Sequence, residues 1–149
     1  MPTGNRRENR LVLRRSNVSD TEPAIKMMRI YKDFRFEAAH FLPNAPEGHP
    51  NARIHGHSFR ARIWVQGTPD EKTGIIFHFD ELQNALSDTR DALDHRLLND
   101  VDGLSAPTLE RITIWLWDRL KDRVPGLIEI EVARDSCNEG CVYSGPTKG

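Results

Sequence analysis

The sequence predicts an α+β fold in which an antiparallel four-stranded sheet carries two helices on one face, in the order ββααββ. Two strand-like stretches come first, two segments with helical spacing of apolar residues follow, and strand-like alternation then returns. The chain has 149 residues, of which 38% are hydrophobic. That is enough to bury one core and leaves little room for a second domain.

The two predicted N-terminal strands lead into histidines. Residues 29–36 have a strand-like composition, and the stretch runs on to His40 before a proline-containing loop. A second stretch begins near His55 and continues to residue 65. Because side chains alternate along a strand with a period of two, we expect His55 and His57 on the same face.

Helical spacing and renewed alternation define the rest of the chain. Leucines at helical spacing predict a helix over residues 79–95, and a second apolar period predicts another over 109–120. Residues 127–132 alternate between apolar side chains and glutamates, which predicts a third strand. A short last strand is expected at 141–143, after a turn at 138–140.

Composition excludes several classes of protein. The formal charge of −1 gives no general argument for nucleic acid or membrane as a partner. No apolar run approaches the roughly 20 residues that a bilayer span needs. The first 26 residues lack the apolar region of a secretory signal, so we expect a cytoplasmic protein. The only cysteines, Cys137 and Cys141, do not amount to a disulfide framework.

The N-terminal segment differs from the remainder of the chain. Residues 1–26 are rich in arginine and show no sustained hydrophobic period, which predicts a disordered extension. We favour a solvated tail over an arm for anionic partners. The folded domain is then 27–149, and either Met27 or Met28 is a candidate translation start.

Three histidines, His40, His55 and His57, indicate an open zinc site. Neutral imidazoles are common zinc ligands, and a catalytic zinc uses three protein ligands so that the fourth position can admit water or substrate. Gly56 removes side-chain bulk between two of them, so that the backbone can approach a bound ion closely. Taken singly, each histidine is more often a surface or core residue than a ligand, and the His-Gly-His triplet shifts this balance.

The predicted architecture also bears on assembly. A single antiparallel sheet with helices on one side leaves sheet edges and part of one face uncovered. Exposed edges favour pairing with neighbouring chains, and closing several sheets into a barrel removes them. We therefore expect a homo-oligomer.

Six short motifs occur in a fixed order between about residues 29 and 145. They are Phe34-Arg35-Phe36-Glu37-Ala38-Ala39-His40, Pro46-Glu47-Gly48-His49, His55-Gly56-His57-Ser58-Phe59, Leu93-Asp94-His95, Pro107-Thr108 with Glu110, and the stretch 137–143. In this order and spacing they resemble the 6-pyruvoyl-tetrahydropterin synthase superfamily, most closely its 6-carboxy-tetrahydropterin synthase branch (QueD).

This resemblance implies a fold, an assembly and a reaction. The fold would be the tunnelling fold, or T-fold, with subunits joined into an oligomeric barrel. The assembly would be a homohexamer, a dimer of trimers, with active sites between subunits. The enzyme would convert 7,8-dihydroneopterin triphosphate to 6-carboxy-tetrahydropterin, releasing acetaldehyde and triphosphate, in queuosine biosynthesis. Zinc would act as a Lewis acid on side-chain oxygens of the substrate.

The resemblance also assigns roles to residues. The three histidines named above would bind the zinc. Asp94 and His95 match the Asp-His members of the family's catalytic trio, in which a carboxylate orients an imidazole that titrates near neutrality. Thr108, Glu110 and Asp135 would bind the substrate. Asp135 stands where the family has the carboxylate that accepts hydrogen bonds from the pterin ring.

Three positions depart from the family pattern. Asn51 stands where the family has its proton-abstracting cysteine, and an amide cannot act as that base. Asp135 replaces a glutamate and is one methylene shorter, so the pterin would lie closer or be bridged by water. His78 stands where the family usually has aspartate.

Three explanations of these departures stay open. Asn51 could be an engineered replacement. The chain could be a divergent paralogue that keeps zinc and pterin binding with weak, redirected or absent lyase activity. A third possibility is that His49, His78 or the Asp94–His95 pair replaces the base. We favour a divergent pterin enzyme over a noncatalytic zinc- and pterin-binding protein, and keep a related pterin side-chain lyase, such as 6-pyruvoyl-tetrahydropterin synthase, as an alternative.

Overall fold

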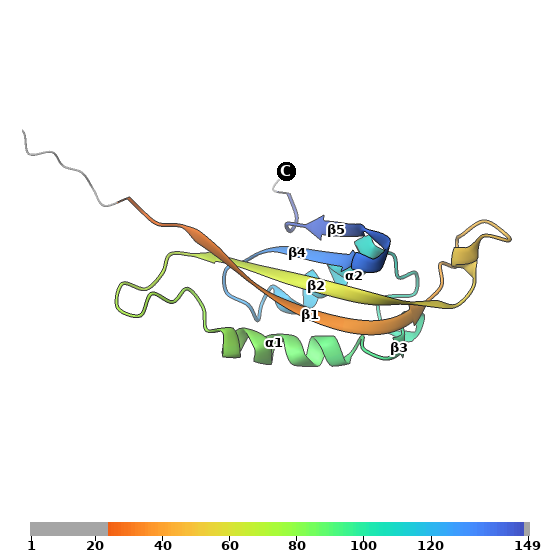
Figure 1. Cartoon of the computed structure of the whole chain (residues 1–149), viewed down its shortest axis with the longest axis horizontal. Coiled ribbons are helices and arrows are strands. Elements are labelled where there is room, and N and C mark those ends of the chain that lie inside the picture. The colour runs from red at the N-terminus through yellow and green to blue at the C-terminus, as the bar shows by residue number, and fades with distance from the viewer. Residues whose placement is uncertain (1–23, 148–149) are drawn as a thin grey trace, which may run out of the picture.

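The computed structural model describes residues 24–147, and within this range five strands form one sheet in the order β3-β1-β2-β4-β5. Two helices and three short 3-10 turns connect them (Figure 1). The strands are β1 (Met28–His40), β2 (His55–Gly67), β3 (Arg96–Leu97), β4 (Leu127–Arg134) and β5 (Glu139–Tyr143). The helices are α1 (Phe79–Asp91) and α2 (Leu109–Leu120), and the 3-10 turns are η1 (Pro50–Ala52), η2 (Leu98–Asp100) and η3 (Asp135–Cys137).

The sheet differs from the predicted four-stranded antiparallel one. The strand β3 is an addition, and it pairs in parallel with Ala38 and Ala39 of β1, so the sheet is mixed. Two residues are too few to show alternation, and these two follow directly on the predicted helix 79–95. That helix ends early, at Asp91, and His95 has a left-handed backbone with φ +57°. The predicted oligomeric barrel concerns several chains and stays a prediction.

The predicted N-terminal extension lies largely outside the described residues. Residues 24–26, which the structure does describe, are exposed and belong to no helix or strand. Within the described part of the chain, no helix is long and apolar enough to cross a membrane.

The antiparallel pairing of β1 with β2 is continuous from Met28–Gly67 to His40–His55. Because side chains alternate, one face of this ladder is apolar and the other is polar. On the apolar face Phe36 stacks on Phe59, with ring centroids 4.9 Å apart, and both side chains are about 1% exposed. The side chains of this face form one side of the hydrophobic core.

Both helices pack on that apolar face. Helix α1 runs along β1 in Figure 1, and it contributes Leu82 and Leu86 to the core. Helix α2 contacts β4 and β5 and contributes Ile112, Leu116 and Leu120. Its N-terminus is capped by Thr108, whose side chain accepts a hydrogen bond from the backbone N–H of Arg111. The cap fixes where α2 begins, which matters because that helix start lies beside the three histidines.

We expect Phe36→Ala to lower the free energy of unfolding by about 3–5 kcal/mol, because it removes a fully buried ring from the centre of the sheet. Urea denaturation of the purified protein measures this change. Ile25→Ala, at a side chain that is 80% exposed, is the matched control and should alter the free energy of unfolding by less than about 0.5 kcal/mol. Equal effects of the two substitutions would contradict the assignment of this face as the core.

Candidate metal centre and adjoining cavity

His40, His55 and His57 converge at one end of the β1–β2 ladder. His40 pairs directly with His55, and His57 pairs with Ala38, so all three side chains lie on the apolar face. One ring nitrogen from each lies within 4.8 Å of the others, which positions the three residues to hold a metal ion. We call this group the histidine cradle. The predicted strand period therefore brings together the predicted ligands.

Hydrogen bonds set the tautomer of every histidine in the cradle. The Nδ1 of His40 lies 2.8 Å from the Pro107 carbonyl oxygen, and the Nδ1 of His55 lies 2.8 Å from that of Arg53. A carbonyl only accepts, so each Nδ1 carries the hydrogen and each Nε2 keeps its lone pair. Ligating histidines in metalloproteins usually have this arrangement.

His57 reaches the same tautomer by a different route. Its Nε2 lies 3.2 Å from Nη1 of Arg134, and a guanidinium can only donate, so Nε2 again holds the lone pair. Its Nδ1 then carries the hydrogen and faces Sγ of Cys137 at 4.0 Å. All three Nε2 atoms therefore present lone pairs.

Burial favours the neutral form of two cradle histidines, His40 and His57. Burial lowers the pKa of His40, whose residue is only 3% exposed. Burial, together with the nearby Arg134 guanidinium, lowers the pKa of His57 to about 4. The Nε2 of His40 is buried without a hydrogen-bond partner among the described residues. An orphaned buried lone pair carries a free-energy cost, and a bound cation at this point would remove it. The residues present therefore fit a metal ion.

A cavity of about 370 Å³ opens beside the cradle, and we call it the metal cavity. It is lined by His40, Leu42, Asn51, Thr108, Leu109, Glu110, Arg134, Glu139 and Gly140. The structure thus brings three predicted site residues, Asn51, Thr108 and Glu110, next to the cradle.

The start of α2 supplies one wall of the metal cavity. The backbone N–H of Glu110 and the Thr108 hydroxyl stabilise the Glu110 carboxylate and hold the pKa of Glu110 below its usual range. The Pro107 carbonyl, one residue before Thr108, accepts the hydrogen bond from Nδ1 of His40. Capping of the helix, orientation of a cradle histidine and placement of a carboxylate are therefore properties of one short segment.

Asp94 and His95 form a pair at the outer edge of β1. One oxygen of Asp94 accepts the backbone N–H of Glu37 at 2.9 Å, and the other lies 3.0 Å from Nδ1 of His95. The Glu37 bond, with His95 and Arg90 nearby, holds the pKa of Asp94 below its usual range. His95 lines a different hollow, which shares no residue with the metal cavity. Within one chain the structure does not bring this pair to the cradle.

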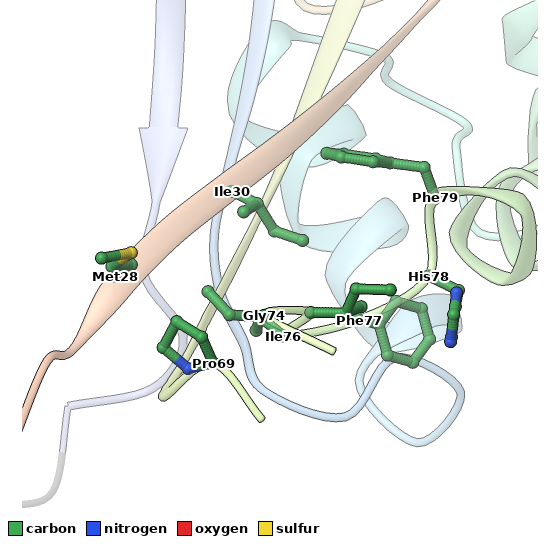
Figure 2. A pocket seen from close by; sticks show the side chains of 9 residues that line it. Met28, Ile30, Pro69, Gly74, Ile76, Phe77, His78 and Phe79 are labelled. Atoms are coloured by element: carbon green, nitrogen blue, oxygen red, sulfur yellow. The ribbon is translucent and has the colours of Figure 1, made fainter. Parts of the chain in front are cut away.

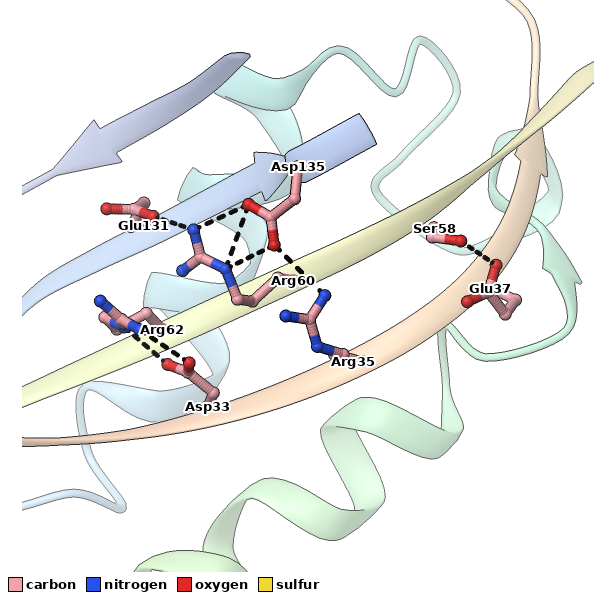
Figure 3. A network of polar contacts seen from close by, with 8 residues as sticks. All are labelled: Asp33, Arg35, Glu37, Ser58, Arg60, Arg62, Glu131 and Asp135. Carbon is pink, nitrogen blue, oxygen red and sulfur yellow. Dashed lines mark hydrogen bonds and ion pairs between the residues drawn. The ribbon is translucent and has the colours of Figure 1, made fainter. Parts of the chain in front are cut away.

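Asp135 points to the polar face of the sheet. Figure 3 shows its carboxylate between two guanidinium groups: Arg60 approaches both oxygens at 3.0–3.3 Å, and Arg35 lies 3.2 Å from one of them. These hydrogen bonds, Arg60 first, hold the pKa of Asp135 below its usual range. Asp135 lines a neighbouring hollow with Arg60 and Glu131 instead of the metal cavity.

The two other histidines considered as replacement bases differ in position. His49 is near Asn51, since its Nδ1 accepts the backbone N–H of Asn51 at 3.1 Å. His78 lies at the start of α1, in an apolar hollow of about 280 Å³ that Met28 and Ile30 also line (Figure 2). Because Met28 and His40 are the two ends of β1, the structure separates His78 from the cradle by the length of that strand.

The sequence did not identify the two charged residues Arg134 and Glu139, which also line the metal cavity, as site residues. They pair across β4 and β5, and a nitrogen of Arg134 lies 2.7 Å from a Glu139 oxygen. A signal was present: Arg134 continues the alternation of Ile130 and Val132 and so falls on the apolar face. A charged residue in that position suggests a polar site at the strand end.

Residues 29–146 match the family model described as 6-pyruvoyl tetrahydropterin synthase, and the chain belongs to this family. The match includes all three cradle histidines and both predicted catalytic partners. Among solved structures, 6-pyruvoyl tetrahydropterin synthase from Caenorhabditis elegans superposes with a TM-score of 0.73 at 21% identity, covering 82% of this chain and 98% of that one. That likeness shows the shared fold.

Within the family, the chain is a 6-carboxy-tetrahydropterin synthase-like member. It is 41% identical over 126 residues to the 6-carboxy-5,6,7,8-tetrahydropterin synthase of Synechocystis, covering 80% of this chain and 95% of the relative. It is also 31% identical over 112 residues to the dihydroneopterin monophosphate aldolase of Pyrococcus furiosus, covering 75% of this chain and 90% of that protein.

The depressed pKa of His57 makes stability of the metal-free protein depend on pH. Between about 6.5, the ordinary histidine value, and about 4, the unfolded chain binds a proton at His57 that the folded chain does not. The free energy of unfolding should therefore fall as the pH falls through this window, by up to about 1.4 kcal/mol per pH unit for a one-proton difference. His57→Gln should reduce this slope in urea titrations with a chelator present. An unchanged slope would exclude His57 as its source.

Proposed function

We propose that the protein is a zinc-dependent lyase that cleaves the side chain of a reduced pterin. The substrates are 7,8-dihydroneopterin triphosphate and one water molecule, and the products are 6-carboxy-tetrahydropterin, acetaldehyde and triphosphate, in the queuosine pathway of the cytoplasm. The observation that carries this proposal is the convergence of three histidine ring nitrogens beside a cavity, in a chain that is 41% identical to a curated 6-carboxy-tetrahydropterin synthase.

Zinc is the metal that this donor set suits best. Zinc held by these three imidazoles would keep a coordination position for an oxygen ligand, as in catalytic zinc sites. Zinc bound there would supply Lewis acidity to a side-chain oxygen of the substrate and so acidify the adjacent C–H bond. The protein holds the three imidazoles in the ligating tautomer through the carbonyls of Pro107 and Arg53 and through the environment of His57.

The proton acceptor is His95. Asn51 has no titrating group, and the Nδ1 of His49 already accepts a hydrogen bond, so its neutral ring carries the hydrogen on Nε2 and has no free lone pair. The Nδ1 of His95 instead donates to Asp94, which leaves Nε2 free to take a proton. Its side chain is 80% exposed, as a group that serves a neighbouring subunit must be before assembly.

This assignment requires a site shared between subunits. His95 and the cradle line separate hollows of one chain, so the His95 that serves a given metal cavity comes from a neighbouring copy, in the hexamer that the family resemblance implies. The outer edge of β1 pairs with β3 only at Ala38 and Ala39, which leaves strand edge for a neighbour within the described residues.

Substrate recognition falls to residues on both faces of the sheet. Thr108 and Glu110 line the metal cavity and offer a hydroxyl and a carboxylate to a polar heterocycle. Asp135 can bind the pterin ring only if one of its two guanidinium partners, Arg35 or Arg60, moves away. Arg35 is the partner that can move, since its side chain is 65% exposed whereas that of Arg60 is 13% exposed.

A noncatalytic zinc- and pterin-binding protein is the second candidate, and Asn51 favours it. The position beside the cradle that carries a thiol in the family carries a neutral amide here, and no described cysteine lines the metal cavity. A related pterin side-chain lyase, such as a 6-pyruvoyl-tetrahydropterin synthase, would use the same cradle and release a different product.

Incubation of zinc-loaded protein with 7,8-dihydroneopterin triphosphate, followed by mass spectrometry, should yield 6-carboxy-tetrahydropterin. Asn51→Cys should raise turnover by at least about tenfold, because it restores a titratable group in the metal cavity. Asn51→Ser, which has a similar size and no thiol, is the control and should not. Saturable pterin binding without product in all three proteins would favour the noncatalytic candidate.

Mixed oligomers test the shared site. His40→Ala removes a metal ligand and His95→Ala removes the base, so each variant alone should be inactive. Coexpressed subunits should recover about a quarter of the wild-type activity, because random mixing joins an intact cradle to an intact His95 at one site in four. Tagged subunits would demonstrate that mixed oligomers form. If such oligomers recover almost no activity, His40 and His95 belong to the site of a single chain.

A further inference from the structure

Arg134 and a bound metal ion would compete for the lone pair on Nε2 of His57. Nη1 of Arg134 lies 3.2 Å away and can only donate, so it occupies that lone pair as a hydrogen-bond donor. An imidazole nitrogen in the ring plane has a single lone pair. A metal bound through Nε2 and a hydrogen bond from Arg134 to the same atom therefore exclude each other.

Arg134 has a second anchor that survives loss of this contact. Its Nη2 lies 2.7 Å from a Glu139 oxygen, across the β4–β5 pairing. Its Nε is buried without a hydrogen-bond partner among the described residues, and its side chain is 19% exposed. A guanidinium released from His57 thus stays among the walls of the metal cavity, which both residues line.

Electrostatic repulsion also opposes simultaneous contact of Arg134 and a metal ion with His57. A divalent ion held by three neutral imidazoles keeps its full positive charge, and a guanidinium at hydrogen-bond distance from one ligand repels it.

We propose that Arg134 is a positioning residue that occupies the Nε2 lone pair of His57 in place of the metal, and that it gives up this contact and keeps only its pairing with Glu139 when the metal binds. This inference rests on the proposed metal binding by the three histidines. Arg134 thereby sets the affinity for the ion, and the shape of the metal cavity depends on metal loading. By linkage, whatever weakens the contact between Arg134 and His57 strengthens metal binding to the same extent.

The experiment measures zinc affinity by competition with a chromophoric chelator, on the full chain. Arg134→Met keeps the bulk of the side chain and removes its donors, and it should bind zinc about tenfold more tightly than the wild type, the effect of losing one competing charge-assisted hydrogen bond. Arg62→Met is the matched control, because Arg62 pairs with Asp33 on the opposite face of the sheet (Figure 3). Its affinity should equal that of the wild type.

A second measurement uses the wild-type protein and does not depend on the folding of a variant. In protein labelled with ¹⁵N-arginine, the Nε–H signal of Arg134 should shift on addition of zinc, while that of Arg62 should stay in place. An unchanged zinc affinity in Arg134→Met, or an unshifted Arg134 signal in zinc-loaded protein, overturns the inference and leaves the proposed function standing. Failure of both wild type and Arg134→Met to bind zinc contradicts the proposed metal site itself.

Discussion

The register between β1 and β2 is the constraint on which the site depends. His40 pairs with His55 at one end of a ladder that also stacks Phe36 on Phe59. A slip of one residue would turn either strand over and carry its histidines to the polar face, while placing arginines in the core. The free energy of burying the aromatic pair therefore also positions the three histidines of the cradle. The cradle needs no separate scaffold, because core packing specifies it.

The same alternation divides the chemistry of the site between two faces. Arg134 and Asp135 are adjacent in the chain, yet Arg134 reaches the cradle on the apolar face and Asp135 reaches Arg60 on the polar one. Glu139 and Gly140 line both the metal cavity and the hollow around Asp135. The β4–β5 hairpin thus separates the metal cavity from the hollow around Asp135. A ligand that contacts both the cradle and Asp135 would have to extend around this hairpin.

Local patterns in the sequence were sufficient for the large elements and for the cradle. Alternation around His55 and His57 and helical spacing near Leu82 and Leu116 depend on residues that are close in the chain. The strand β3 could not be found in this way, because its two residues are a strand only through pairing with Ala38 and Ala39. The end of α1 at Asp91 likewise depends on Glu37, which binds Asp94 and His95 from more than fifty positions away.

The surroundings of Asp135 show a further limit of the sequence. The position matches a family carboxylate, and the resemblance assigns it to the pterin. Its partners Arg60 and Arg35 are 75 and 100 residues away in the chain, and no spacing rule connects them. Motifs identify which side chains are candidates for a functional role. The hydrogen-bond partners of those side chains depend on the order of the strands in the sheet.

The geometry of His95 bears on the choice between catalysis and binding alone. A non-glycine residue in the left-handed region carries a backbone strain that persists only where surrounding contacts impose it. Here both backbone groups of Glu37 impose it, one by binding the Asp94 carboxylate and one by accepting the N–H of His95. The result is an exposed imidazole whose Nδ1 is committed to Asp94 and whose Nε2 is free. The proposed lyase, which lacks the thiol of the family, would require such a proton acceptor, whereas binding of a metal and a pterin alone would not.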